Sequence, residues 1–181
     1  MNELNYLYHY YESEIGPFVN LTDQPEDKAE QIFSEIRERG ETFASKRSKD
    51  YLIIRRGLEQ QARTRFIEKG GKPVRKVPHY MTLGPCEWLV DWYKHGKELK
   101  IHIDSFYTEI VSFTFGDLFP TMRYEDGKPY RKQVYTKSEI FDIIKAHGIP
   151  QEFNRDGKLG PERYIEAQIW DDRPLYEYLY T

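Results

Sequence analysis

The stretch that most constrains the fold lies near the end of the chain, at residues 162–170, where apolar and polar side chains alternate. A turn rich in glycine and proline precedes it at residues 156–161 and predicts a break in the chain there. The alternation predicts a strand with one apolar face and an opposite face carrying an acid, an amide and an indole: Glu166, Gln168 and Trp170. Such a face indicates either a wet surface or a pocket, and the sequence leaves both open.

The remaining segments predict strands and helices in a non-alternating order. Strands are expected at residues 5–11, 78–83, 99–103 and 110–115, and a hairpin at residues 122–135 around Asp126-Gly127. Helices are expected from the N-cap Asp23 to Gly40, at residues 48–69 and 87–94, and from the capping box of Thr136 and Glu139 to Gly148. Residues 175–180 suit an edge strand or one helical turn. We therefore expect one α+β domain over residues 1–181, with a mostly antiparallel sheet of about six strands and three to four helices.

Composition narrows the classes of protein that the chain can belong to. A net charge of −3 argues against a generally basic nucleic-acid-binding protein. One cysteine, Cys86, rules out an internal disulfide and a cysteine-based zinc site, and the five histidines form no metal-binding motif, so no metal is expected. No apolar run approaches the roughly 18 residues of a membrane span, and the N-terminus lacks a signal peptide's features. We expect a cytoplasmic protein with no membrane partner.

Charge is distributed unevenly along the chain. The segment Lys46–Lys76 carries eleven lysines and arginines against three acids, so its net charge is about +8 and that of the rest about −11. One interpretation is a solvated helix face balanced by acidic neighbours. The other is a site for the phosphates of a dinucleotide or of a nucleic-acid backbone.

Common catalytic motifs are missing from the sequence: there is no Gly-x-Ser-x-Gly elbow, no P-loop and no Gly-x-Gly-x-x-Gly. Hydrolases of the elbow type, P-loop NTPases and Rossmann-type dehydrogenases are therefore not expected. The remaining candidates are a histidine, a tyrosine and a glutamate on three predicted strands: His9, Tyr80 and Glu166.

The context of these three residues resembles the His-Tyr-Glu branch of ADP-ribosyltransferases, which includes diphtheria-type toxins. Residues 7–10, Leu-Tyr-His-Tyr, resemble the first-strand motif of that branch, and Tyr80-Met-Thr-Leu-Gly-Pro followed by a helix resembles its tyrosine-bearing segment, with Tyr93 as a second tyrosine. Residues 100–106 and 110–113 are similar to its paired middle strands. Glu166 stands in the place of the catalytic glutamate, and Glu162 is the alternative.

This resemblance implies a domain that binds NAD or a related nucleotide as substrate, with no tightly bound cofactor, and that cleaves the nicotinamide–ribose bond if catalysis is retained. It implies that Glu166 stabilises the developing cation, that Tyr80 and Tyr93 sandwich the nicotinamide, and that His9 holds the adenosine ribose. The pyrophosphate would be neutralised by an arginine of the basic segment: Arg55, Arg56 or Arg63. The resemblance requires His9, Tyr80 and Glu166 to converge on one cleft.

A second resemblance covers nearly the whole chain. The segments His9-Tyr-Tyr, Gly16-Pro-Phe, Pro78-His-Tyr-Met, Ser112-Phe-Thr-Phe-Gly-Asp, Tyr130-Arg-Lys-Gln-Val-Tyr-Thr and Asp156-Gly-Lys-Leu-Gly-Pro-Glu-Arg-Tyr-Ile-Glu resemble a family of small uncharacterised proteins of Bacillus-type bacteria. That family carries no known activity. The basic charge of Lys46–Lys76 and the many tyrosines indicate the alternative function, a non-enzymatic module that binds nucleic acid, a nucleotide or a partner protein through that segment. A small-molecule enzyme without a common catalytic motif is a further alternative.

Overall fold

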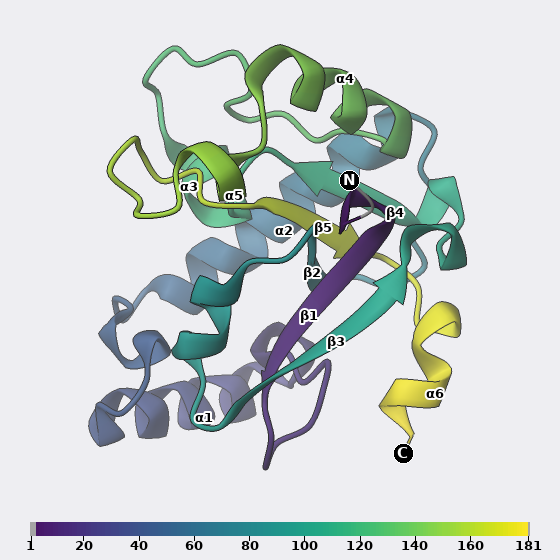
Figure 1. Ribbon diagram of the computed structural model, residues 1–181. Coiled ribbons are helices and arrows are strands. Elements are labelled where there is room, and N and C mark those ends of the chain that lie inside the picture. Colours follow the sequence, from purple (N-terminus) through teal and green to yellow (C-terminus); the bar gives the residue numbers. More distant parts are fainter. Residues whose placement is uncertain (1–2, 181) are drawn as a thin grey trace.

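The fold is built on one antiparallel sheet of five strands in the order β3-β1-β2-β5-β4, as seen in a computed structural model that describes residues 3–180 (Figure 1). The strands are β1 (Tyr6–Glu12), β2 (His79–Leu83), β3 (Gly96–His102), β4 (Val111–Thr114) and β5 (Ile165–Ile169). The predicted α+β class is confirmed. The sheet has five strands in place of the expected six or so, and the segment at residues 162–170 forms a central strand of it.

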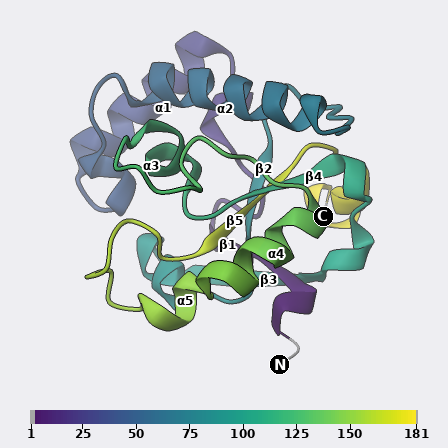
Figure 2. The same ribbon diagram turned by 90° about the horizontal axis from the view of Figure 1, so that it is seen from above.

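Helices cover both faces of the sheet, with α2 and α3 on one side and α4 on the other (Figure 2). Their bounds are α1 (Glu26–Arg39), α2 (Tyr51–Glu68), α3 (Leu118–Arg123), α4 (Lys137–His147), α5 (Pro150–Phe153) and α6 (Tyr176–Leu179). Short 3-10 helices include Leu21–Asp23, Phe43–Lys46 and Glu87–Trp92. Within residues 3–180, no helix combines the length and the apolar character that crossing a membrane requires.

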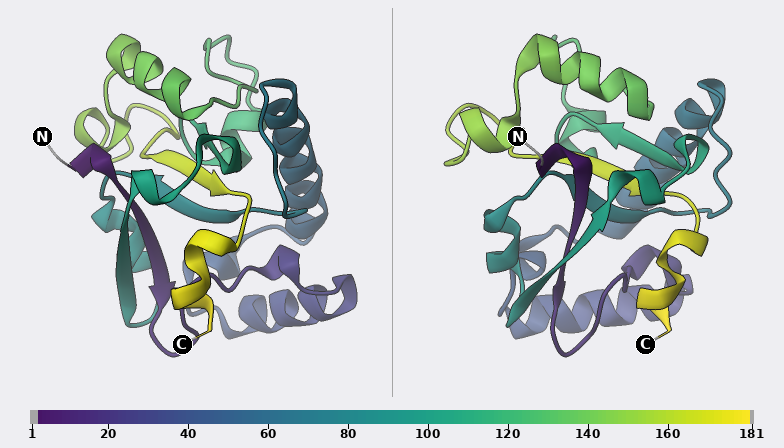
Figure 3. Two further views of the ribbon diagram at one scale, coloured as in Figure 1. Left: turned by 90° about the vertical axis from the view of Figure 1, so that its right-hand side faces the viewer. Right: turned by 45° about the vertical axis from the view of Figure 1, so that its right-hand side comes forward.

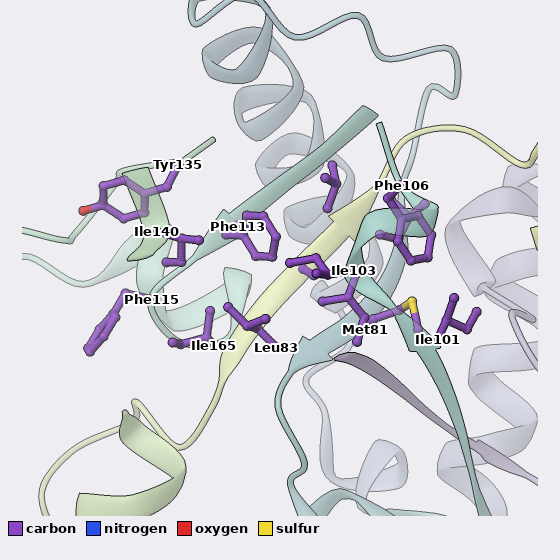
Figure 4. Close-up of a cluster of buried hydrophobic side chains, with 14 of the residues drawn as sticks. Met81, Leu83, Ile101, Ile103, Phe106, Phe113, Phe115, Tyr135, Ile140 and Ile165 are labelled. Atoms are coloured by element: carbon purple, nitrogen blue, oxygen red, sulfur yellow. The ribbon is translucent and has the colours of Figure 1, made fainter. Parts of the chain in front are cut away.

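The main core lies between the sheet and α4. Leu83, Phe113 and Ile165 point from three strands toward Ile140 of α4, and all four side chains are fully buried (Figure 4). Burial of side chains of this size contributes about 1.5–3 kcal/mol each relative to exposure. The C-terminal helical turn packs against the same cluster through Leu179, over a different part of the sheet from α4 (Figure 3). Of the two structures expected for residues 175–180, the helical turn is the one formed.

Helix ends match the sequence signals closely, with one exception. The Thr136 side chain accepts from the Glu139 backbone and the Glu139 carboxylate accepts from the Thr136 backbone, so the predicted capping box is confirmed. Gly40 ends α1 in the left-handed conformation at φ 68°. The exception is Asp23, which does not cap α1, because the helix begins after Pro25 and the Asp23 carboxylate instead pairs with Arg75.

The expected hairpin at residues 122–135 is wrong. Residues 118–123 form α3, and within residues 124–135 the only pairing with the sheet is a single bridge from Tyr135 to Phe113. The Asp126 carboxylate accepts hydrogen bonds from Arg131 Nε (2.8 Å) and Nη2 (2.7 Å). Arg131 also pairs with the buried Glu162 next to β5. The polar turn residues therefore anchor an irregular loop to the sheet.

Two glycines, Gly96 and Gly57, differ in how closely other atoms surround them, and their replacement tests the packing of the fold. A Cβ at Gly96 would lie 2.3 Å from the Val90 carbonyl oxygen, whereas a Cβ at Gly57, within α2, would meet nothing within 4 Å. We expect Gly96→Ala to lower the free energy of unfolding by about 1–3 kcal/mol through overpacking. We expect Gly57→Ala to raise it by about 0.5–1 kcal/mol, because glycine is unfavourable in a helix interior. Urea unfolding measures both, and equal effects of the two substitutions would contradict the packing.

Candidate functional site

The polar face of β5 lies under α2 and α3 and is not a wet surface. Glu166 is 6% exposed, and Gln168 and Trp170 are fully buried. Gln168 accepts from the Ser112 hydroxyl (2.9 Å) and donates to the Thr114 hydroxyl (3.0 Å), while the Trp170 indole donates to Ser112 (2.8 Å). The amide and the indole are thus satisfied within the protein, which leaves the acid as the member of this face that can act on a ligand.

A small cavity adjoins that acid. Its volume is about 10 Å³, roughly the space of one water molecule. Four elements supply its walls: α2, β2, β5 and the start of α3 with the residue before it. The lining residues are Arg55, Leu58, Tyr80, Asp117, Leu118, Phe119 and Glu166. Of the two possibilities that the polar face of the strand left open, the wet surface is wrong, and what adjoins the acid is a void large enough for one water molecule.

One carboxylate oxygen of Glu166 is fixed and the other is free. Oε1 accepts from the Leu118 backbone (3.2 Å) and from Gln168 Nε2 (3.1 Å), whereas Oε2 accepts no hydrogen bond from any residue in the described range 3–180. Desolvation by burial, followed by the negative charge of Asp117, raises the pKa of Glu166 well above its usual range, and the charge of Arg55 acts in the opposite direction. Glu166 is therefore a carboxyl group that favours its protonated form and keeps one oxygen available.

Asp117 is held rigidly beside this acid. Its Oδ1 accepts from the Phe119 backbone (2.7 Å), which caps α3, and its Oδ2 accepts from the Tyr164 hydroxyl (2.8 Å). Burial, with the charge of Asp117 next, raises the pKa of Tyr164 well above its usual range, so this hydroxyl remains a donor. Both oxygens of the Asp117 carboxylate are therefore hydrogen-bonded, and the group shares the cavity lining with Glu166.

The opposite wall depends on Glu59, whose side chain is completely buried. Its Oε1 accepts from Arg55 Nε (3.0 Å), the Thr22 hydroxyl (3.0 Å) and the Tyr80 hydroxyl (2.6 Å). The Arg55 guanidinium also donates to the Tyr51 hydroxyl and lies 4.3 Å from the centre of the Tyr80 ring. A charged fork and an aromatic ring are thus fixed together against the cavity.

Three of the residues proposed from the sequence meet at this cavity: Arg55, Tyr80 and Glu166. Tyr93 lies near them but farther out, with 38% of its surface exposed. Desolvation raises the pKa of Tyr93, and the positive charges of Arg47 and Arg55 act against that rise. Tyr93 therefore stands at the outer edge of the site.

His9 does not join them, so the expected convergence of His9, Tyr80 and Glu166 is wrong. Tyr8 pairs with Thr82 across the sheet and Thr82 pairs with Glu166, which puts Tyr8 on the Glu166 face. His9, the next residue, points to the opposite face. Its Nδ1 donates to the Tyr80 carbonyl oxygen (2.8 Å) and its Nε2 accepts from the Phe18 backbone (2.8 Å). His9 thus ties β1 to β2.

Arg56, Arg63 and Glu162 also lie outside the cavity lining. Arg56 donates to the Gln24 carbonyl (3.3 Å), and Arg63 donates to the carbonyls of Arg75 (3.0 Å) and Pro73 (2.9 Å). Glu162 is buried against Arg131 and Lys128, so of the two glutamates Glu166 is the one at the cavity. These side chains stabilise loops and leave Arg55 as the arginine of the cavity wall.

Other cations of Lys46–Lys76 are also engaged within the protein. Arg75 pairs with both Asp23 and Asp172 (2.5 Å each), and Lys69 pairs with Glu139 (2.9 Å). Five of the eleven cations of this segment, Arg55, Arg56, Arg63, Lys69 and Arg75, therefore meet acids or carbonyls of the chain itself.

Sequence patterns did not point to Asp117, Glu59, Tyr51 or Tyr164. One signal was present: Glu59 stands four residues after Arg55 and is one of only three acids in a strongly basic segment. Asp117 follows a glycine ahead of a helix that the sequence did not predict.

No family model, curated protein or solved structure matched the chain. Within residues 3–180, no group of three or more His, Cys, Asp or Glu side chains is arranged to hold a metal ion.

The buried state of His9 predicts acid sensitivity. Desolvation lowers the pKa of His9 to about 4 from its ordinary 6.5. Between these values the unfolded chain binds more protons, so the contribution of His9 to stability is lost as the pH falls through this window, by up to about 1.4 kcal/mol per pH unit. We expect His9→Gln to reduce this slope in urea unfolding, whereas replacement of the exposed His95 by glutamine leaves it unchanged. Equal slopes for all three proteins would contradict the assignment.

Proposed function

We propose that the cavity at Glu166 binds NAD or a related nucleotide and cleaves its nicotinamide–ribose bond, as ADP-ribosyltransferases do, but without His9. His9 lies on the opposite face of the sheet, so the convergence that the His-Tyr-Glu branch requires is absent, and the proposal rests on Glu166, Arg55 and Tyr80 alone. The observation that carries this proposal is the buried Glu166 carboxyl group, with one oxygen free, in a lining shared with Arg55 and Tyr80. A desolvated acid with a strongly raised pKa beside a charged partner is typical of catalytic sites.

The chemistry of this bond suits such an acid. When the bond between the ribose C1′ and the nicotinamide nitrogen breaks, its electron pair leaves with the nicotinamide, which becomes neutral, and positive charge develops on the ribose. Glu166 favours its protonated form in the free protein, so this step requires that it release its proton to solvent as the positively charged nicotinamide ring enters. The ionised group would then stabilise the charge on the ribose, because a preorganised carboxylate in a desolvated site acts more strongly than one in water. The oxygen of water or of an acceptor then bonds to C1′ and loses its proton to Glu166.

The walls of the cavity suit other parts of the substrate. The ring of Tyr80 offers a flat surface for nicotinamide, and the Arg55 guanidinium can donate hydrogen bonds to an amide or phosphate oxygen. Because the cavity has a volume of about 10 Å³, binding requires a wall to move. Phe119, half-buried and stacked on Tyr51 at 5.0 Å, is the side chain whose displacement would open it.

Glu166→Gln tests the proposed role of the acid. The amide keeps the shape of the side chain but cannot ionise, so we expect NAD to bind the variant as it binds the natural chain while nicotinamide release falls by about 10²–10³ or more. Calorimetry measures binding, and chromatography of released nicotinamide measures turnover. Glu152→Gln, on the exposed surface of α5, is the matched control and should retain full turnover.

Three outcomes would contradict the proposal. They are absence of NAD binding at millimolar concentration, binding by the natural chain without nicotinamide release, and equal release by the Glu166→Gln variant.

A further inference from the structure

A strip of aromatic and basic side chains lies next to the cavity and takes no part in the chemistry described above. The rings of Phe43 and Trp92 stack in parallel, with centres 4.1 Å apart, and Trp88 meets Trp92 edge-on at 4.8 Å. Arg163 covers the ring of Trp88, with its guanidinium carbon 3.7 Å from the centre of that ring. Phe43 is 42% exposed, so one side of this stack faces solvent.

The stack is assembled from two segments that are distant in the sequence. Phe43 begins the 3-10 helix Phe43–Lys46, and Trp92 ends the 3-10 helix Glu87–Trp92. The buried Trp92 Nε1 has no hydrogen-bond partner in the part of the chain that the structure describes. A solvent-facing pair of stacked rings is an energetic cost to a protein on its own, and it offers a flat surface to a third ring.

Arg47 connects this stack to the cavity. Its guanidinium carbon lies 4.4 Å from the centre of the Tyr51 ring. Within residues 3–180 the guanidinium group makes neither an ion pair nor a hydrogen bond, whereas the Arg47 backbone N–H donates to the Ala44 carbonyl. Tyr51 in turn accepts a hydrogen bond from Arg55 and stacks on Phe119, both of which line the cavity. A guanidinium group that is held over a ring with its donors unused is well suited to a phosphate.

We propose that Phe43, Trp92, Tyr93 and Arg47 form the outer half of the same binding site and take the base and the phosphates of a nucleotide. The base stacks on the exposed ring of Phe43, and Arg47 neutralises the phosphates between the base and the cavity. Tyr93 follows Trp92 directly in the chain, and the ring of Tyr51, which Arg47 covers and to which Arg55 donates, joins the two halves. This inference rests on the proposed function, which sets the orientation of the nucleotide by placing its reactive ribose at Glu166.

Binding of ADP and adenosine tests the strip without any bond cleavage, because neither probe contains nicotinamide. We expect ADP to bind the natural chain and to quench tryptophan fluorescence. Arg47→Gln should weaken ADP binding about tenfold or more while leaving adenosine unaffected, since only ADP carries phosphates. Phe43→Ala should weaken both probes about tenfold through lost stacking.

Matched controls are available on exposed positions elsewhere. Arg39→Gln removes a charge whose side chain is 69% exposed, and Phe153→Ala removes a ring that is 44% exposed. Both should bind ADP as the natural chain does. Thermal unfolding of each variant establishes that it is folded before its affinity is compared.

The outcomes separate this inference from the proposed function. ADP binding that depends on Arg47 and Phe43, without NAD cleavage, would support the proposed base and phosphate site and contradict the proposed NAD cleavage. NAD cleavage at an unchanged rate and affinity in Arg47→Gln and Phe43→Ala would contradict the proposed base and phosphate site and support the proposed NAD cleavage. Absence of ADP binding at millimolar concentration, or equal ADP affinity in all variants and controls, would also overturn the strip.

Discussion

The site depends on one buried carboxylate, that of Glu59. It collects hydrogen bonds from α2, from β2 and from the short helix before α1, through Arg55, Tyr80 and Thr22. An unpaired buried charge costs several kcal/mol, so each of these donors offsets the desolvation of Glu59 and is fixed in return. The position of Arg55 and of the Tyr80 ring against the sheet follows from this requirement.

The charges of Asp117 and Arg55 influence which protonation state Glu166 favours. Asp117 disfavours a second negative charge in the desolvated lining and Arg55 favours it, so the protonation of Glu166 responds to whatever enters the cavity. A ligand that develops positive charge next to Glu166 would favour the ionised form. A desolvated acid between a second acid and an arginine occurs at catalytic sites and also in structural charge networks, so the proposed role of Glu166 depends on the chemistry it is tested for.

Local patterns predicted the parts of the molecule that depend on local physics. The capping box at Thr136 and the two-residue period of β5 were predictable, because caps and strand alternation are properties of short segments. Arg55, Tyr80 and Glu166 were predictable as candidates from residue type and context. Whether β5 faced water or a pocket was not, because that depends on where α2 packs.

Errors arose wherever long-range pairing decides the outcome. The face of His9 is set by the register of β1 against β2, which places Tyr8 with Thr82 and turns the imidazole away from Glu166. Asp126-Gly127 has the residues of a hairpin turn, yet the pairing of Asp126 with Arg131 uses them to hold a loop. The importance of Asp117 could not be predicted without α3, since its carboxylate acquires its place by capping that helix.

The most direct test of this account is the pKa of Glu166, followed by the ¹³C chemical shift of its side-chain carboxyl carbon across a pH titration. The account predicts a midpoint well above the ordinary value of 4.5, and a lower midpoint in Asp117→Asn, because the substitution removes the negative charge that opposes ionisation. A midpoint near 4.5 in both proteins would mean that Glu166 is neither desolvated nor coupled to Asp117. That result would contradict its role as the acid of a functional site.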